Sequence, residues 1–252
     1  MKFLAAWQFL TSIPLPRLRE ASPEELGRSA VYFPVVGLVI GVILAGLYWL
    51  LSFILPAAVV NVLLIVLLVV ITGALHLDGF VDTCDGLAVQ PTVEDRWRVM
   101  HDSRVGAFGI IGVVLLLLVK YVSLSNIPGT LMIATLLFLP VVSRWAMVYA
   151  VFAYPYARPS GLGKVLKQGF GWRSFTIATV ITLVVALAMF PLWHFTGLVV
   201  MLGVWIVAVV MAVIFKQKFA GLTGDNYGAI NEVAEVMVLI LVILLARIGL
   251  AW

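Results

Sequence analysis

Three aspartates follow directly after an apolar run that is long enough to cross a membrane. They lie in the segment His76-Leu-Asp78-Gly-Phe-Val-Asp82-Thr-Cys-Asp85-Gly86. This spacing places Asp78, Asp82 and Asp85 on one face of a helix. Three carboxylates in such close proximity repel one another unless a cation neutralises them. Hard oxygen ligands suit Mg²⁺ or Mn²⁺ better than zinc. The pattern predicts a metal site that assists phosphoryl transfer.

Two glycines flank these acids. Gly79 and Gly86 have no side chain, so they would let a bulky phosphorylated ligand approach the backbone. The alternative for the whole segment is a solvated loop that happens to be acidic. The shared helical face of the three aspartates favours the metal site.

The composition indicates an integral membrane protein. Of the 252 residues, 63% are hydrophobic and 11% are charged, and the mean hydropathy is +1.16. Too little polar surface remains to cover a soluble globule of this size. Residues 59–75 and 105–119 are nearly unbroken apolar runs, whereas strands of a membrane barrel would alternate polar and apolar residues. The spans are therefore predicted to be helices.

We expect one all-α domain over residues 1–252, a polytopic bundle of about seven transmembrane helices. Residues 1–12 are too short and too weakly charged for a cleaved signal, and they are predicted to form an interfacial helix. The sequence leaves the oligomeric state open. The predicted spans are residues 31–55, 57–75, 106–122, 129–152, 175–193, 197–215 and 233–250.

The charges sort the connections between these spans into two sets. The links at 52–56, 123–128 and 191–196 contain no Lys or Arg, and the other links carry most of the basic residues. The positive-inside rule then predicts a cytoplasmic N-terminus and a multi-pass protein of the cell inner membrane. The acids fall on the same side, so we expect anionic substrates at an active site that faces the cytoplasm. The net charge of +4 is explained by topology and anionic lipid, and nucleic acid is not expected as a partner. The single cysteine, Cys84, excludes an intramolecular disulfide.

Two further polar clusters belong with the first. Asp102, Ser103 and Arg104 precede the third span and offer an acid, a hydroxyl and a guanidinium, a mixture that suits phosphate. The segment from Gly221 to Glu235 contains the remaining candidates at the entry of the last span. They are Thr223, Asp225, Glu232 and Glu235.

The acids of the last segment are costly in a membrane unless they face a polar cavity or bind a cation. Arg144, near the cytoplasmic end of the fourth span, is predicted to bind an anionic ligand or one of these acids. For Arg104 and Arg144 the alternative is a structural ion pair or an anchor at the membrane surface. Lys120 and Arg247 are interpreted as such interfacial anchors.

These segments resemble a known family. His76 to Gly86, Met100-His-Asp-Ser-Arg104 with Gly106, Gly161-Leu-Gly163, and Thr223-Gly-Asp225 with Gly228 and Glu232 are similar to the signature segments of the cobalamin-5′-phosphate synthases, also called adenosylcobinamide-GDP ribazoletransferases. Phe9 to Pro14 and Phe33 to Gly37 fit the same family. The resemblance therefore runs over nearly the whole chain and in order.

The resemblance implies the last assembly step of the cobalamin nucleotide loop. A ribose hydroxyl of α-ribazole, or of its 5′-phosphate, would attack the cobinamide-linked phosphorus of adenosylcobinamide-GDP and release GMP. Mg²⁺ held by Asp78, Asp82 and Asp85 would neutralise the diphosphate. Of the catalytic candidates Asp82 and Asp85, Asp85 is predicted by its position to take the hydroxyl proton.

The other candidates take supporting roles in this hypothesis. Arg104 or Arg144 would hold phosphate, and Gly79 and Gly86 would lie against the bound substrate. The last cluster would complete a second metal site, with Asp225 and Glu232 as ligands, or would grip the nucleotide. Substrate contacts are also predicted for Asp102, Ser103, Thr223 and Glu235.

Two other functions stay open. CDP-alcohol phosphotransferases also place several aspartates and glycines at membrane helix ends, but their Asp-Gly-x-x-Ala-Arg opening is missing here, because Asp78-Gly79 is followed by Phe80-Val81-Asp82-Thr83. A non-enzymatic cation carrier would need acids at mid-span or access from both faces. The acids of this chain are predicted to stop at the cytoplasmic ends of the spans.

Overall fold

The computed structural model describes residues 2–15, 22–88, 92–102 and 104–250, and within these ranges it is helical with no strand. The helices are α1 (Lys2–Leu10), α2 (Pro23–Ser29), the 3-10 turn η1 (Ala30–Tyr32), α3 (Phe33–Leu51), α4 (Ala57–Ile71), α5 (Leu75–Ala88), α6 (Val93–Val99), α7 (Ala107–Asn126), α8 (Gly129–Ala153), α9 (Leu162–Gly169), α10 (Trp172–Ala188), α11 (Phe190–Trp193), α12 (Thr196–Phe219) and α13 (Gly224–Arg247). The predicted all-α class is confirmed.

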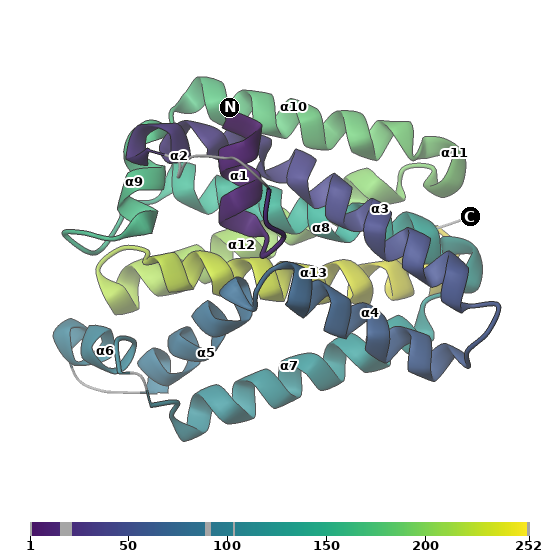
Figure 1. The fold of residues 1–252 in the computed structure, drawn as a ribbon, viewed down its shortest axis with the longest axis horizontal. Helices are drawn as coiled ribbons and strands as arrows, with labels where there is room; N and C mark the ends of the chain where they lie inside the picture. The colour runs from purple at the N-terminus through teal and green to yellow at the C-terminus, as the bar shows by residue number, and fades with distance from the viewer. Residues whose placement is uncertain (1, 16–21, 89–91, 103, 251–252) are drawn as a thin grey trace.

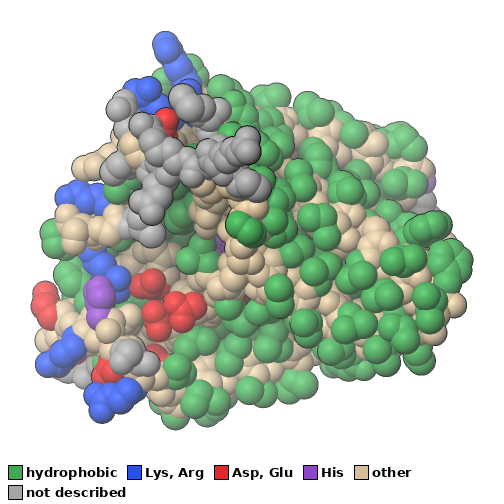
Figure 2. All heavy atoms as spheres, viewed as in Figure 1, with side chains coloured by type: hydrophobic (Ala, Val, Ile, Leu, Met, Phe, Trp, Pro, Cys, Tyr) green, Lys and Arg blue, Asp and Glu red, His purple; other side chains and the backbone are tan. Residues whose placement is uncertain are grey.

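The long helices are apolar enough to cross a membrane. In the described part of the chain, five single helices meet this requirement, and two bent helix pairs raise the number to as many as seven. Large apolar side chains such as Ile110, Leu115 and Leu118 on α7 are exposed on the outside of the bundle. Figure 2 shows that charged side chains gather at one end of the molecule and that the rest of this face is mainly hydrophobic. The protein is therefore a multi-pass membrane protein, as predicted.

Two helices form the centre of the bundle. α8 is almost entirely buried and packs against α3, α10, α12 and α13, and α13 also contacts α5 and α7 (Figure 1). Close approach of α3 to α8 depends on small residues. Gly37 and Gly41 of α3 lie directly against the backbone of Pro140 and Leu137 in α8.

The second predicted span differs from the structure at its end. Residues 57–75 were expected to form one helix, but the helix ends at Ile71 and the chain turns by 89° into α5. Gly73 and Ala74 make this turn with positive φ angles of 58° each. The hydroxyl of Ser12, which follows α1, donates a hydrogen bond of 2.6 Å to the carbonyl oxygen of Val70 and covers the exposed end of α4. The break sets α5, with its three aspartates, across the end of α13.

The N-terminal segment forms a helix as expected. Ala6 and Leu10 of α1 are fully buried, and α1 packs against α2 and α3. The placement of this helix at the membrane surface stays a prediction. The predicted span at 175–193 is formed by α10 and the short α11, and α10 bends away from α9 by 98°.

The packing of α3 on α8 gives a matched test on one helix. A methyl group at Gly41 would lie 2.5 Å from the carbonyl oxygen of Leu137, whereas at Gly46 it would meet no atom within 4 Å. Gly41→Ala should destabilise the protein by about 1–3 kcal/mol, because the helices must move apart. Gly46→Ala should be neutral or slightly stabilising, because alanine favours a helix. Thermal unfolding in detergent measures both, and equal melting temperatures would contradict the packing described.

Candidate active site

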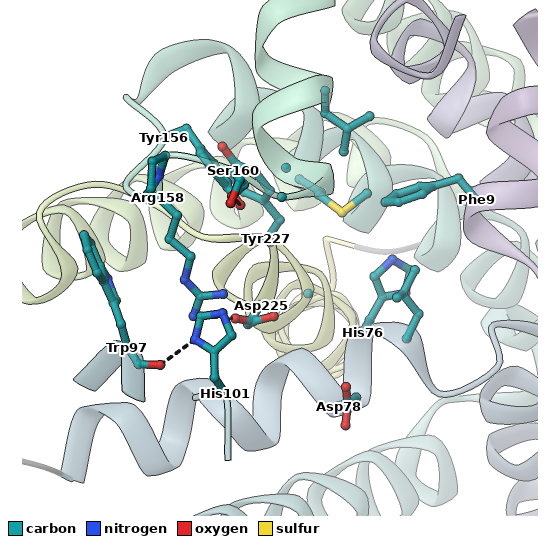
Figure 3. Close-up of a pocket in the computed structure, with 18 residues that line it drawn as sticks. Phe9, His76, Asp78, Trp97, His101, Tyr156, Arg158, Ser160, Asp225 and Tyr227 are labelled. Carbon is teal, nitrogen blue, oxygen red and sulfur yellow. Dashed lines mark hydrogen bonds and ion pairs between the residues drawn. The ribbon is translucent and has the colours of Figure 1, made fainter. Parts of the chain in front are cut away.

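A cavity of about 460 Å³ opens at the charged end of the bundle. Its walls come from α5, the beginning of α13, the loop between α8 and α9, and the end of α6, with single side chains from α1 and α8 and two residues from α9 (Figure 3). Asp78, Asp225 and Arg158 bring charge to this cavity, and further polar side chains come from His76, His101, Tyr156, Ser160 and Tyr227. The first and third predicted clusters therefore meet at one place.

α5 and α13 cross at very short distance because glycine lies at each contact. A side chain at Gly79 would collide with the backbone of Asp225, and one at Gly228 would collide with the backbone of His76. Gly86 lies against Met100 and Phe219 instead of open space. The prediction that Gly79 and Gly86 give room to a ligand was therefore wrong. These glycines allow other segments of the protein to pack closely against α5.

The N-terminus of α13 is held by its own side chains. The hydroxyl of Thr223 accepts a hydrogen bond from the amide of Asn226 and donates one of 3.3 Å to the Asp225 carboxylate. The Asn226 side chain donates to Thr83 Oγ1 on α5. Thr223 is fully buried, so its role is to cap the helix and orient Asp225 rather than to contact substrate as predicted.

Arg158 is the basic residue of the cavity, and the sequence interpretation missed it. Its loop pairs with the residues before α13, because Ala157 donates a backbone hydrogen bond of 2.8 Å to Leu222. Arg158 forms an ion pair of 3.2 Å with Asp225, and both side chains are visible in Figure 3. The positive-inside rule had accounted for Arg158 as one more basic loop residue. Its position between the prolines of Tyr154-Pro-Tyr-Ala-Arg158-Pro159, in a rigid loop, is the signal that could have singled it out.

The three aspartates of α5 do not act as one group. Both carboxylate oxygens of Asp85 accept backbone hydrogen bonds, from Gly106 at 2.7 Å and Gly109 at 2.8 Å. Asp85 is buried and caps the N-terminus of α7, so this geometry does not support its predicted roles as metal ligand and general base. Asp78 is exposed in the cavity and Asp82 is half-buried, and no hydrogen bond or ion pair from the described residues reaches either carboxylate.

Asp102 and Arg104 of the second predicted cluster pair with each other. Arg104 is exposed and holds Asp102 through two side-chain hydrogen bonds, of 3.1 and 2.8 Å. These bonds lower the pKa of the Asp102 carboxyl to about 2. Neither residue lines the cavity, and Ser103 lies outside the described residues. The phosphate site of this cluster stays a prediction, with Asp102 and Arg104 bonded to each other outside the cavity lining.

The donor atoms of the cavity suit a magnesium ion in chemical type. Asp78 and Asp225 face the same space, and Asp82 lies one helical turn beyond Asp78 on α5. In the described ranges, no three acidic, histidine or cysteine side chains already form a metal-binding group. Mg²⁺ usually takes one or two protein carboxylates and completes its shell with water and substrate phosphates, so this partial set fits it.

Known proteins are similar to this chain in sequence. The family model described as cobalamin-5-phosphate synthase matches residues 2–243. The chain belongs to the cobalamin-5-phosphate synthase family. Three similar proteins are named adenosylcobinamide-GDP ribazoletransferase, and no solved structure matches the chain. They come from Geotalea daltonii (40% identical, covering 94% of both chains), Roseiflexus sp. (36% identical, 93% of this chain and 86% of the relative) and Thermosynechococcus vestitus (36% identical, 95% of this chain and 94% of the relative). The resemblance inferred from the motifs is confirmed.

In this member of the cobalamin-5-phosphate synthase family, the remaining predicted site residues lie deeper in the bundle. Glu232 and Glu235 both accept hydrogen bonds of 2.6 Å from Lys120 on α7, and Glu235 also pairs with Arg144 on α8 at 2.5 Å. All four side chains are buried, and their charges balance. We call these four residues the buried ion network.

The buried ion network corrects several predictions. Glu232 and Glu235 are bound to cations of the protein, so the geometry does not support a metal or substrate role for them. Arg144 is fully buried and does not line the cavity, so the geometry does not support phosphate binding by it either. Glu232 lies roughly 12 Å along α13 from its first residue, so the acids do not stop at the ends of the spans. Lys120 is not an interfacial anchor. For Arg144, the alternative interpretation as a partner in a structural ion pair was correct.

Removal of one partner of the buried ion network should be severe. Lys120→Met leaves two buried carboxylates with less compensation and should cost about 3–5 kcal/mol of folding stability. Arg247→Met is the matched control, because Arg247 is exposed at the other end of α13. The measurement is thermal unfolding of the two purified variants. Similar melting temperatures for both would refute the importance of the network.

Proposed function

We propose that this protein is an adenosylcobinamide-GDP ribazoletransferase. It transfers the cobinamide-phosphate group of adenosylcobinamide-GDP to α-ribazole or α-ribazole 5′-phosphate, with GMP as the second product. Family membership supports the reaction class. We assign the reaction to the cavity because two carboxylates, those of Asp78 and Asp225, lie there with the guanidinium of Arg158.

The reaction is a phosphoryl-type substitution. The oxygen of a ribose hydroxyl forms a new bond to the cobinamide-linked phosphorus, and the bond from this phosphorus to the GMP oxygen breaks. The hydroxyl proton must be accepted, and the leaving GMP takes the electron pair of the broken bond. Positioning and neutralisation of negative charge dominate catalysis of such transfers.

Arg158 is suited to hold the diphosphate. Its guanidinium is directed to Asp225, its Nε has no hydrogen-bond partner in the described structure, and it lines the cavity. A guanidinium binds two phosphate oxygens at once, which fixes the orientation of the group as well as its charge. Thr223 holds Asp225 in place beside it.

Asp82 is suited to accept the proton. It lies one helical turn beyond Asp78 on α5 and, unlike Asp85, has no backbone amide bound to its oxygens in the described structure. Mg²⁺ would be held by Asp78 and Asp225, the two carboxylates that line the cavity. The chemistry that this ion supplies when bound is neutralisation of the diphosphate and of the charge that grows on GMP. These residues replace the predicted set that contained Asp85 and Glu232.

The proposed location is the cell inner membrane, with the cavity facing the cytoplasm. The basic residues and the cavity acids share one end of the bundle, and the positive-inside rule assigns such an end to the cytoplasm. A cation carrier is disfavoured, because the intramembrane acids Glu232 and Glu235 are already neutralised by Lys120 and Arg144. A lipid-forming CDP-alcohol phosphotransferase is the remaining alternative.

The product nucleotide separates these two enzymes. The purified protein should release GMP when given adenosylcobinamide-GDP, α-ribazole and Mg²⁺, and it should release no CMP from CDP-alcohol donors. A metal chelator should stop the reaction. Release of CMP, or no GMP above a boiled control, would exclude the proposed function.

Within this assay, Arg158→Gln should lower kcat/KM for adenosylcobinamide-GDP by about 100-fold, since a charge-assisted contact to the reacting phosphate is lost. Arg104→Gln is the matched control and should retain activity within about threefold, since Arg104 is exposed and bonded only to Asp102. The melting temperatures of both variants show whether a loss of activity comes from unfolding. A larger loss for Arg104→Gln than for Arg158→Gln would return the phosphate site to the loop before α7.

A further inference from the structure

The cavity has two chemically different ends. Figure 3 shows Arg158, His101 and Trp97 on one side and Phe9 and His76 on the other, with Asp225 between them. The cavity lining also contains apolar side chains, from Leu75, Met147 and Leu166. We call the part around Phe9 and His76 the inner end of the cavity. The one charged side chain labelled on this side in Figure 3 is Asp78, below His76, so this end suits a flat, largely apolar group.

Two polar side chains of the cavity wall are buried without a partner. His76 and Tyr227 are each only 2% exposed. Within the described structure, neither ring nitrogen of His76 takes part in a hydrogen bond, and the Tyr227 hydroxyl has no hydrogen-bond partner. A buried polar group without a hydrogen bond is unfavourable by about 1–3 kcal/mol, so these groups favour a ligand that can complete them.

The backbone holds both residues firmly in position. Gly228 lies on the backbone of His76, and Tyr227 precedes it on α13, so the α5 and α13 crossing fixes both side chains. The ring of Tyr227 also lies 6.4 Å from that of Tyr156, at an angle of 34°. The cavity is therefore a preformed site with aromatic walls and two hydrogen-bonding groups, His76 at the inner end and Tyr227 nearer to Tyr156.

The number of these polar groups discriminates between the bases of the two substrates. Guanine presents several donors and acceptors around its ring, and an apolar wall with two polar groups would leave most of them without a partner. A benzimidazole nucleoside has one unsubstituted ring nitrogen, which accepts one hydrogen bond, and an apolar benzene edge. Neutral histidine can donate that bond.

We propose that the inner end of the cavity binds the benzimidazole base of the acceptor nucleoside, with His76 donating to its free ring nitrogen and Tyr227 bonding to its ribose. This inference rests on the proposed function and refines it. The acceptor hydroxyl then lies toward Asp82 and the diphosphate toward Arg158, so the two substrates occupy opposite ends of one cavity.

Steady-state kinetics with both substrates test the assignment. His76→Leu and Tyr227→Phe should each raise KM for α-ribazole by about tenfold, the effect of one lost hydrogen bond in a buried site. KM for adenosylcobinamide-GDP should change by less than about twofold. His76→Gln, which keeps a donor, should recover part of the acceptor affinity. Tyr121→Phe on α7 is the control and should leave both constants unchanged.

Direct binding of α-ribazole to the purified full-length protein separates this inference from the proposed function. If wild type releases no GMP but binds α-ribazole, and His76→Leu binds it more weakly, the function fails and the inference stands. A rise in the donor KM instead of the acceptor KM would assign the inner end to guanosine and overturn the inference. Lower stability of His76→Leu and Tyr227→Phe with both KM values unchanged would also overturn it, since the two residues would then be structural.

Discussion

Neutralisation of carboxylates inside an apolar bundle is the constraint on which the structure depends. α5 and α13 carry six acids between them, and an uncompensated charge at this depth is very costly. Four of the six have partners. Asp85 accepts hydrogen bonds from backbone amides at the start of α7. Glu232 and Glu235 form ion pairs with Lys120 and Arg144. Asp225 forms an ion pair with Arg158. Within the described structure, only Asp78 and Asp82 are left without such partners. Asp78 lines the cavity, and Asp82 lies one helical turn beyond it on α5.

The same constraint explains how the cavity is built. The buried ion network joins α7, α8 and α13 below it, and the glycines Gly79 and Gly228 bring α5 directly onto α13. The acids of the site are thus held on rigid helices, whereas Arg158 comes from a loop fixed by backbone bonds at Leu222. Rigid placement of this kind is what phosphoryl transfer requires, because positioning contributes much of the rate.

The sequence predicted the elements better than the partners. Long apolar runs identify membrane helices, and the motif resemblance found the family, because both signals are local. The break at Gly73 and Ala74 was missed, and the hydroxyl that bonds to the end of α4 there comes from Ser12, 58 residues away from Val70 along the chain. Asp85, Lys120 and Arg144 were misassigned for a similar reason, since their partners lie 21, 112 and 91 residues away along the chain. Spacing shows which acids share a face, but it does not show which of them another helix neutralises.

The central claim is that the acids of α5 and α13 form one reacting site, and a double-mutant cycle tests it most directly. GMP release should be measured for Asp82→Asn, Asp225→Asn and the combined variant, each with its melting temperature. If the two carboxylates act as a unit, each single change should remove most of the turnover, and the second should add little further loss. Multiplicative losses, or near-normal turnover of Asp225→Asn, would contradict a single site built by the two helices.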